Sequence, residues 1–262
     1  MKYPDDFINK IICGDCLSIM PEIPDKSIDL VITSPPYDNL RNYQEYSFNF
    51  EGIAKELFRV IKQSGVVVWV VGDATIDGSE TGTSFKQALY FKGIGFNLHD
   101  TMIYWKNSAP LNQKRYEPAF EYMFILSKGS PKVFNPILEK KSWKDKRLRK
   151  ATKRNKDGSY VIGFASQKEN KIADNIWYYN VGGGHVTKDK IAYQHPAIFP
   201  EQLAADHIVS WSNKGNLVLD PMNGSGTTTK MAKLLGRKYI GIEISPDYCK
   251  IAEERLRQEI LL

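Results

Sequence analysis

The sequence predicts an α/β fold: a mostly parallel, twisted sheet with helices on both faces and one small irregular insertion. Two observations carry this prediction. Short apolar runs that suit buried strands alternate with segments whose apolar residues recur at helical spacing. Such alternation is typical of parallel strands joined by crossover helices. From residue 129 to residue 194 the alternation stops, and we expect the insertion there.

The first part of the chain contains several candidate strands, each rich in the β-branched and aromatic residues that favour extended structure. They are residues 11–13, 28–32, 66–71, 101–105 and 120–126. Before the third of these strands, residues 53–61 place their apolar side chains on one face of a helix. We expect Gly65 to end that helix.

Regular structure resumes after the insertion. The predicted order is a helix at 201–211, a strand at 217–219, a helix through Met231 and Leu235, a strand at 239–242 and a closing helix. The closing helix begins with Ser245-Pro246-Asp247, which supplies a cap, a first-turn proline and a favourable charge.

The composition favours an intracellular protein, which we expect in the cytoplasm with no membrane association. Hydrophobic residues make up 42% of the chain and charged residues 25%, which is ordinary for a soluble protein. No apolar run reaches the ~20 residues of a membrane helix, and the N-terminus lacks a signal-peptide pattern. Cys13 and Cys16 form a single C-x-x-C without a second pair or a suitably spaced histidine pair, so we expect no metal site.

Positive charge is concentrated in residues 140–156, which hold ten Lys or Arg and one acid. Because the whole chain carries +6, the other 245 residues together carry −3. A basic stripe on a mildly acidic body is typical of a polyanion-binding surface, although a solvated exposed segment is the alternative. The candidate contacts to a nucleic-acid backbone are Lys140, Lys141, Lys144, Arg147, Arg149, Lys153 and Arg154.

A glycine-rich turn, Asp220-Pro-Met-Asn-Gly-Ser-Gly-Thr-Thr228, separates a predicted strand from a predicted helix. Glycines let backbone amides approach a ligand there, and a helix N-terminus favours an anion. Glu243 ends the next strand, where a carboxylate can accept ribose hydroxyls. A nicotinamide cofactor is a weaker alternative, because the third glycine of that fingerprint would fall at Thr229.

A stiff proline loop, Thr33-Ser34-Pro35-Pro36-Tyr37, follows the predicted strand 28–32. Two adjacent prolines fix two φ angles and remove two backbone donors, so the chain must leave the strand in an extended conformation.

Together, the proline loop and the glycine turn resemble the β class of amino-group DNA methyltransferases, which use S-adenosylmethionine. Their catalytic signature is [DNS]-P-P-[YFW] and their cofactor turn is D-P-F-x-G-S-G-T-T, with Met222 here in place of Phe. The segment 195–200, His-Pro-Ala-Ile-Phe-Pro, resembles their H-P-A-x-F-P element, and Cys13-Gly14-Asp15 resembles the G-D at the end of an adjacent strand.

The resemblance implies a Rossmann-like methyltransferase fold with a circularly permuted motif order. It divides the chain into a catalytic half at 1–128, a target-recognition insertion at 129–194 and a cofactor-binding half at 195–262. The implied cofactor residues are Asp15, Thr33, His195, Pro196, Phe199, Asp220, Pro221, Gly224, Ser225, Gly226, Thr227, Thr228 and Glu243. Asp15 would hold the adenine amino group, Glu243 the ribose hydroxyls and Asp220 the methionine part. An ordinary turn-forming aspartate is the alternative for Asp15.

The implied catalytic residues are Ser34, Pro35, Pro36 and Tyr37. An exocyclic amino nitrogen is a poor nucleophile, and hydrogen-bond acceptors that strengthen as it becomes positive would stabilise the transition state. The target base must leave the duplex, and Tyr37 could stack on it. None of the cysteines lies in the Pro-Cys context of enzymes that attack ring carbon 5.

Ser34 favours cytosine N4 as the target, since adenine N6 enzymes of the resembled family typically have Asp at this position. Adenine methylation is the main alternative. RNA or protein-glutamine methylation, a catalytically silent DNA-binding module and a nicotinamide oxidoreductase are less favoured. The implied partner is double-stranded DNA, and a homodimer and a cognate restriction endonuclease are further candidate partners.

Overall fold

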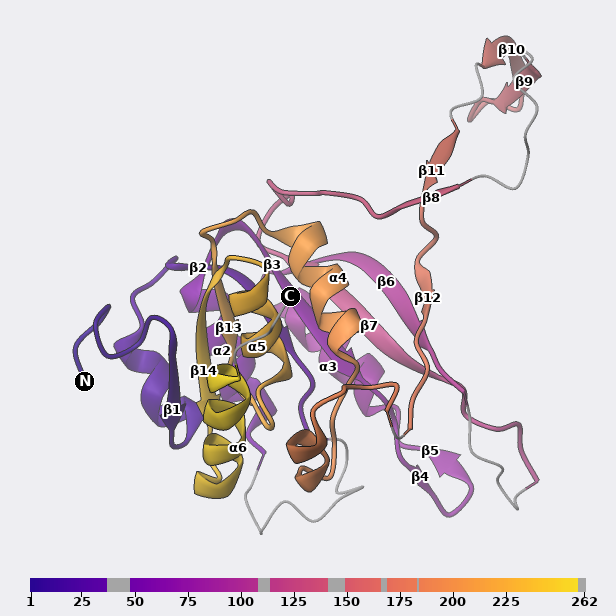
Figure 1. Cartoon of the computed structure of the whole chain (residues 1–262). Coiled ribbons are helices and arrows are strands. Elements are labelled where there is room, and N and C mark those ends of the chain that lie inside the picture. Colours follow the sequence, from indigo (N-terminus) through magenta and orange to yellow (C-terminus); the bar gives the residue numbers. More distant parts are fainter. Residues whose placement is uncertain (37–47, 108–113, 141–148, 166–168, 183, 259–262) are drawn as a thin grey trace. The chain divides into compact units, whose positions relative to one another are not determined.

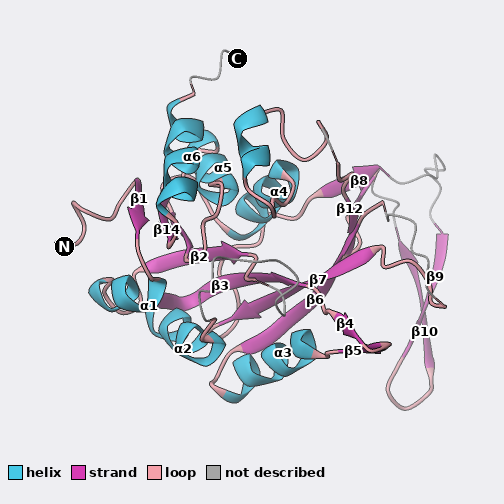
Figure 2. Cartoon of the chain, turned by 90° about the horizontal axis from the view of Figure 1, so that it is seen from below, coloured by secondary structure: helices cyan, strands magenta, loops and turns pink. Residues whose placement is uncertain are grey.

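The computed structural model describes residues 1–36, 48–107, 114–140, 149–165, 169–182 and 184–258 (Figures 1 and 2). The chain divides into two compact units. The first consists of Met1–Asn135 together with Asn175–Leu262, and the second is Pro136–Asp174.

The first unit contains an eight-stranded sheet in the order β1-β14-β13-β2-β3-β7-β6-β12. In that order the strands are Lys10–Cys13, Lys238–Glu243, Leu217–Asp220, Ile28–Thr33, Ile61–Val71, Phe120–Ser127, Asn97–Trp105 and Ile176–Tyr178. Neighbours are parallel except for β7, which is antiparallel to both β3 and β6. Strands from the two ends of the chain therefore lie side by side, as the colours of β2 and β13 show in Figure 1.

Helices cover both faces of this sheet (Figure 2). One face packs against α1 (Cys16–Ile19), α2 (Phe50–Val60) and α3 (Thr83–Gly93). The other packs against α4 (Glu201–Trp211), α5 (Thr227–Leu234) and α6 (Pro246–Arg257). The short elements of this unit are η1 (Met20–Glu22), β4 (Thr75–Ile76), β5 (Ser79–Glu80) and η2 (Lys190–Gln194). The predicted α/β architecture is confirmed, and none of the described helices is long and apolar enough to cross a membrane.

The expected role of Gly65 as a helix end is wrong. Helix α2 ends at Val60, and β3 begins at the next residue and runs through Gly65. A side chain on Gly65 would lie 3.0 Å from the carbonyl oxygen of Asp29 in β2. The glycine therefore permits close approach of two strands at the point where their register shifts.

The segment expected to be irregular contains regular strands. In the second unit, β9 (Arg149–Arg154) pairs antiparallel with β10 (Tyr160–Ala165), and β8 (Leu138–Lys140) pairs antiparallel with β11 (Asn170–Ile172). The residues of β9 are almost all charged or small, so no apolar alternation marks the strand in the sequence. The unit boundary at residue 174 also differs from the expected end of the insertion at 194, because β12 pairs with β6 in the main sheet.

Candidate functional site

Four neighbouring parallel strands, β1, β14, β13 and β2, end at the same edge of the sheet. Cys13 pairs with Glu243, Leu219 with Ile240, and Val31 with Leu219. Because carboxyl ends of parallel strands meet at one edge, the predicted motifs that follow β1, β2 and β13 come together there.

Asp220 lies at the centre of this edge and is buried. Its Oδ1 accepts a 2.8 Å hydrogen bond from Thr33 Oγ1 and a 3.1 Å bond from the amide of Met222. Burial raises the pKa of Asp220 to about 6, although hydrogen bonds from Thr33, Thr228 and the Met222 amide oppose the shift. This edge of the sheet thus holds a buried carboxylate whose pKa, although raised, lies below neutral pH.

Glu243, also buried, is fixed by the backbone of two turns. Its Oε2 accepts from the amide of Gly224 at 2.7 Å, and its Oε1 accepts from the amide of Ser245 at 2.9 Å. Burial raises the pKa of Glu243, and the amides of Ser245 and Gly224 work against that shift. The carboxylate is therefore held in one orientation beside the glycine turn.

Both glycines of the turn adopt positive φ angles, and a side chain at either position would be crowded. Gly226 has φ +83°, and a side chain on it would lie 2.8 Å from the Cβ of Ala252 in α6. Gly224 has φ +49°, and a side chain there would lie 3.0 Å from Nε2 of His195. Ser225, Thr227 and Thr228 complete the turn and the first residues of α5.

His195 lies against Gly224 and so places the segment 195–200 beside the glycine turn. Its Nδ1 accepts a 3.1 Å hydrogen bond from the amide of Ala197, and its ring packs edge-on against Tyr248 with centroids 4.3 Å apart. Phe199 packs against the core on the α4–α6 face, Pro196 is exposed and Pro221 is buried. No motif indicated Tyr248, which is an isolated aromatic residue in α6.

Asp15 has a structural role of its own. As the N-cap of α1 it accepts from the amide of Leu17 at 3.1 Å and from Ser18 Oγ at 3.3 Å. This is the turn-forming alternative, and it leaves the side chain exposed. The amide of the preceding Gly14 donates to the carbonyl of Glu243, which places Asp15 beside the Glu243 turn. Its role toward a cofactor stays a prediction.

The proline loop leaves β2 next to the Thr33–Asp220 contact. Ser34 and Pro36 are partly exposed, and Pro35 is buried. On the side of the glycine turn, Thr228 Oγ1 donates a 3.3 Å hydrogen bond to the carbonyl of Ile32. The fourth predicted catalytic residue, Tyr37, lies outside the described residues.

The predicted DNA-contacting residues fall in the second unit. Lys140 ends β8, and Arg149, Lys153 and Arg154 lie in β9; Lys140, Lys153 and Arg154 are exposed. The guanidinium of Arg154 lies 5.8 Å from the centroid of the Tyr160 ring across the β9–β10 pair. Lys141, Lys144 and Arg147 lie outside the described residues.

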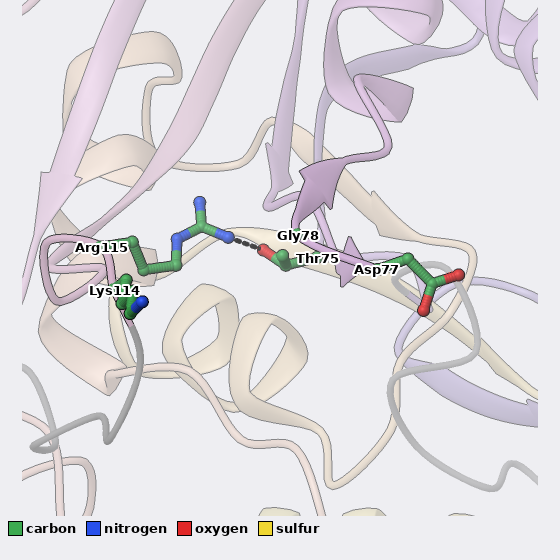
Figure 3. A pocket seen from close by; sticks show the side chains of 5 residues that line it. All are labelled: Thr75, Asp77, Gly78, Lys114 and Arg115. Atoms are coloured by element: carbon green, nitrogen blue, oxygen red, sulfur yellow. Dashed lines mark hydrogen bonds between the residues drawn. The ribbon is translucent and has the colours of Figure 1, made fainter.

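Sequence reasoning missed a surface pocket of about 530 Å³ beyond the end of β3 (Figure 3). Thr75, Asp77, Gly78, Lys114 and Arg115 line it. Arg115 donates hydrogen bonds to Thr75 Oγ1 and to Glu80, and so connects the β6–β7 connection to the β4–β5 hairpin. Within the described part of the chain, no group of three or more His, Cys, Asp or Glu residues is arranged to hold a metal ion.

Comparison with known proteins places this chain in a family. The model of the N6/N4 methyltransferase family, described as DNA methylase, matches residues 28–254. The orphan methyltransferase M.BamHII of Bacillus amyloliquefaciens is 58% identical over 245 residues, which cover 92% of each chain.

Two solved structures share the fold. One is the cytosine-N4-specific PvuII DNA methyltransferase, with a TM-score of 0.71 and 21% identity over 96% of this chain and 87% of that one. The other is a DNA modification methylase of Thermus thermophilus in complex with S-adenosyl-L-methionine, with a TM-score of 0.63 and 23% identity over 94% of each chain. The predicted Rossmann-like methyltransferase fold is thereby confirmed. The chain belongs to the DNA methylase family, the S-adenosylmethionine-dependent N6/N4 amino-methyltransferases.

Proposed function

We propose that this protein transfers a methyl group from S-adenosylmethionine to the exocyclic N4 amino group of a flipped cytosine in double-stranded DNA. The observation that carries the proposal is the bond between Thr33 and Asp220. It joins the Ser34-Pro35-Pro36 loop to the glycine turn, so the groups proposed for the two reactants lie at one edge of the sheet. Holding two reactants in line is a large part of what such an enzyme must do.

The residues at this edge suit the cofactor. The ionised Asp220 would attract the ammonium group of the methionine part, and Glu243 would accept the ribose hydroxyls. Asp15 would accept from the adenine amino group, with His195 and Phe199 completing the pocket. When bound, S-adenosylmethionine supplies an electrophilic methyl group on a sulfonium centre.

The proline loop would act on the target base. Ser34 Oγ and the carbonyl of Pro35 would accept the two amino hydrogens, which directs the nitrogen lone pair at the methyl group. These acceptors bind more strongly as positive charge develops on nitrogen, and so favour the transition state over the ground state. Tyr37 would stack on the extruded base.

Cytosine is supported over adenine by Ser34 at the first position of the catalytic motif. A hydroxyl can donate as well as accept, so Ser34 could also meet the ring nitrogen N3 beside the cytosine amino group. Residues of the second unit, with Lys140, Lys153 and Arg154 exposed, would contact the DNA backbone. We propose a restriction-modification or an epigenetic role for this methylation. The Bacillus amyloliquefaciens relative is named an orphan methyltransferase, and the epigenetic role needs no partner endonuclease.

The experiment is to incubate the protein with methyl-labelled cofactor and mixed-sequence duplex DNA, digest the DNA to nucleosides and separate them. We expect label in N4-methylcytosine. Label in N6-methyladenine would overturn the choice of base, and no label in any nucleoside would overturn DNA methylation. The Ser34→Ala variant is the matched control, because it removes one acceptor and leaves the cofactor turn unchanged.

A further inference from the structure

A cluster of four ionic side chains, two buried bases and two partly exposed acids, lies beside the glycine turn. We call Asp189, Glu201, Lys230 and Arg255 the ion cluster. Lys230 Nζ contacts Asp189 Oδ2 at 2.5 Å and Glu201 Oε1 at 2.7 Å. Arg255 Nε contacts the same Asp189 oxygen at 3.1 Å, and its Nη2 contacts the same Glu201 oxygen at 2.7 Å. Each acid thus binds both bases.

The ion cluster is balanced in charge, and its two bases are buried while Asp189 and Glu201 are 14% and 20% exposed. The side chain of Arg255 is 0% exposed and that of Lys230 is 9% exposed. Burial alone would raise the pKa of Asp189, but hydrogen bonds from Lys230 and Arg255 outweigh it and leave that pKa lowered. Charge balance around buried bases is by itself weak evidence for a stabilising role, since apolar side chains often stabilise such a site as well. The groups that the ion cluster binds are therefore more informative about its role.

Arg255 holds the glycine turn directly. Its Nη1 donates to the carbonyl of Ser225 at 2.7 Å, to Ser225 Oγ at 3.0 Å and to Thr227 Oγ1 at 3.2 Å. The other end of the Ser225–Gly226 peptide is also fixed, because the amide of Gly226 donates to the carbonyl of Asn223 at 2.8 Å. One peptide plane of the turn is therefore held at both its oxygen and its nitrogen.

The two acids bracket the segment that carries His195. Asp189 precedes η2, and Glu201 is the first residue of α4. Because both bind the same two bases, they close residues 190–200 into a loop. Thr187 strengthens this closure, since its Oγ1 donates to Glu201 at 2.8 Å and accepts from the amide of Asp189 at 3.0 Å.

We propose that Arg255 is a positioning residue for cofactor binding, and that the ion cluster sets the glycine turn and the segment 195–200 in fixed relation to each other. The inference rests on the proposed cofactor site. Arg255 touches the turn through its backbone and side chains and acts on the cofactor only through them.

The test compares Arg255→Lys with Arg59→Lys. Lysine keeps the positive charge but lacks the planar fork that reaches the carboxylates and the Ser225 carbonyl together. Arg59 is a matched control: it binds Glu56, Asp25 and the carbonyls of Ile23 and Met20, on the face of the sheet opposite the glycine turn. Wild-type binding of S-adenosylmethionine, measured first by calorimetry, tests the proposed cofactor site separately.

In Arg255→Lys we expect KM and Kd for S-adenosylmethionine to rise by about tenfold or more, while kcat at saturating cofactor stays within about twofold. Amide hydrogen exchange should accelerate in peptides covering 220–230 and 189–201, measured below the unfolding transition. Arg59→Lys should lower the melting temperature and leave cofactor binding and exchange in both segments unchanged.

An unchanged cofactor Kd in folded Arg255→Lys would overturn the inference while leaving the proposed function intact. Equal loss of cofactor affinity in Arg59→Lys would also overturn it, since the effect would then follow general stability. If Arg255→Lys does not fold, Glu201→Gln is used instead, because its amide oxygen still accepts from Thr187 and Arg255. It should weaken cofactor binding in the same direction, and wild-type affinity in Glu201→Gln would contradict the proposal.

Discussion

The hydroxyl of Thr33 donates a 2.8 Å hydrogen bond to the carboxylate of Asp220, a residue 187 positions later in the chain. Both side chains are buried. Thr33 ends β2 and Asp220 ends β13, and the parallel pairing of these strands brings the two residues to the same edge of the sheet. A single bond thus connects the proposed catalytic loop with the proposed cofactor turn.

Replacing Thr33 with Val should weaken methyl transfer. The side chain keeps its shape but leaves the buried Asp220 carboxylate without one donor, and a hydrogen bond to a charged group contributes about 1.5–3 kcal/mol. We expect kcat/KM for S-adenosylmethionine to fall about ten- to a hundredfold, measured by steady-state kinetics. Thr33→Ser restores the donor and should recover most of the loss, and full activity in Thr33→Val would show that the bond is dispensable.

Asp220→Asn should increase stability and weaken cofactor binding. The pKa of Asp220 is about 6 in the folded protein and near 3.8 when unfolded, so the folded state binds the proton more tightly. Ionisation then lowers the unfolding free energy as pH rises from about 4 to 6, by about 3 kcal/mol in all. Urea unfolding should show Asp220→Asn more stable than wild type at about pH 7.5 but not at about pH 4.

Cofactor affinity should change in the opposite direction. The amide of Asp220→Asn carries no charge to attract the cofactor ammonium group, so calorimetric Kd for S-adenosylmethionine should rise. Wild-type affinity should also decline as pH falls through about 6, where Asp220 takes up its proton. Asp247→Asn, at a side chain that is 76% exposed, is the control and should alter neither property. Equal destabilisation of Asp220→Asn at both pH values would refute the assignment.

His207 should make the fold sensitive to acid. Its ring is fully buried against Trp177 and the sulfur of Met123, and burial lowers its pKa to about 3. The unfolded chain takes up a proton near pH 6.5, so stability is lost as pH falls from about 6.5 towards 3. At about pH 5 the loss amounts to about 2 kcal/mol.

His207→Leu removes this titration. From about pH 7.5 to pH 5, the unfolding free energy of the wild type should therefore fall by about 2 kcal/mol more than that of the variant. Urea denaturation at the two pH values measures this directly. His185→Leu, at an exposed histidine, should retain the wild-type pH dependence. An identical pH dependence in wild type and His207→Leu would contradict the prediction.

Neutralising Lys140, Lys153 and Arg154 to Gln should weaken DNA binding for every sequence tested. Each phosphate contact contributes about 0.9 to the slope of log K against log salt, so three contacts should flatten it by about 2.7. Fluorescence anisotropy at several salt concentrations measures the slope. The control changes Lys10, Lys214 and Lys238 to Gln; they are exposed at the amino ends of β1, β13 and β14, away from the proposed site. Equal slopes of log K against log salt in the two triple variants would show that the second unit does not contact the DNA backbone.

The strands and motif turns of the sheet were predictable because their signals are local. An apolar run such as 28–32, followed by two prolines, marks both a buried strand and the place where it ends. Once such strands are parallel, their carboxyl ends must meet, and this brings Thr33, Asp220 and Glu243 together without any contact being known.

Other elements lack a local signal. Helix α3 was not predicted, because two of its buried residues, Ser84 and Gln87, are polar and interrupt the apolar face. Gln87 is accommodated there because it accepts a 2.8 Å hydrogen bond from Trp69 Nε1. Strand β9 was not predicted, because its charged residues give no alternation of apolar and polar side chains. The ion cluster could not be predicted at all, because its acids and bases are far apart in sequence and only the folded chain gives them common partners.

The position of β2 has a consequence for synthesis on the ribosome. This strand lies between β3 and β13, and Asp220 is translated 187 residues after Thr33, an interval of roughly 10–40 s at ordinary rates of synthesis. Until then one edge of β2 has no partner, and Arg255, which holds the glycine turn, is made later still. If the proposed cofactor site and the proposed role of Arg255 are correct, a nascent chain carries its proposed catalytic loop long before it can bind the methyl donor, and methyl transfer to DNA has to wait until α6 has emerged.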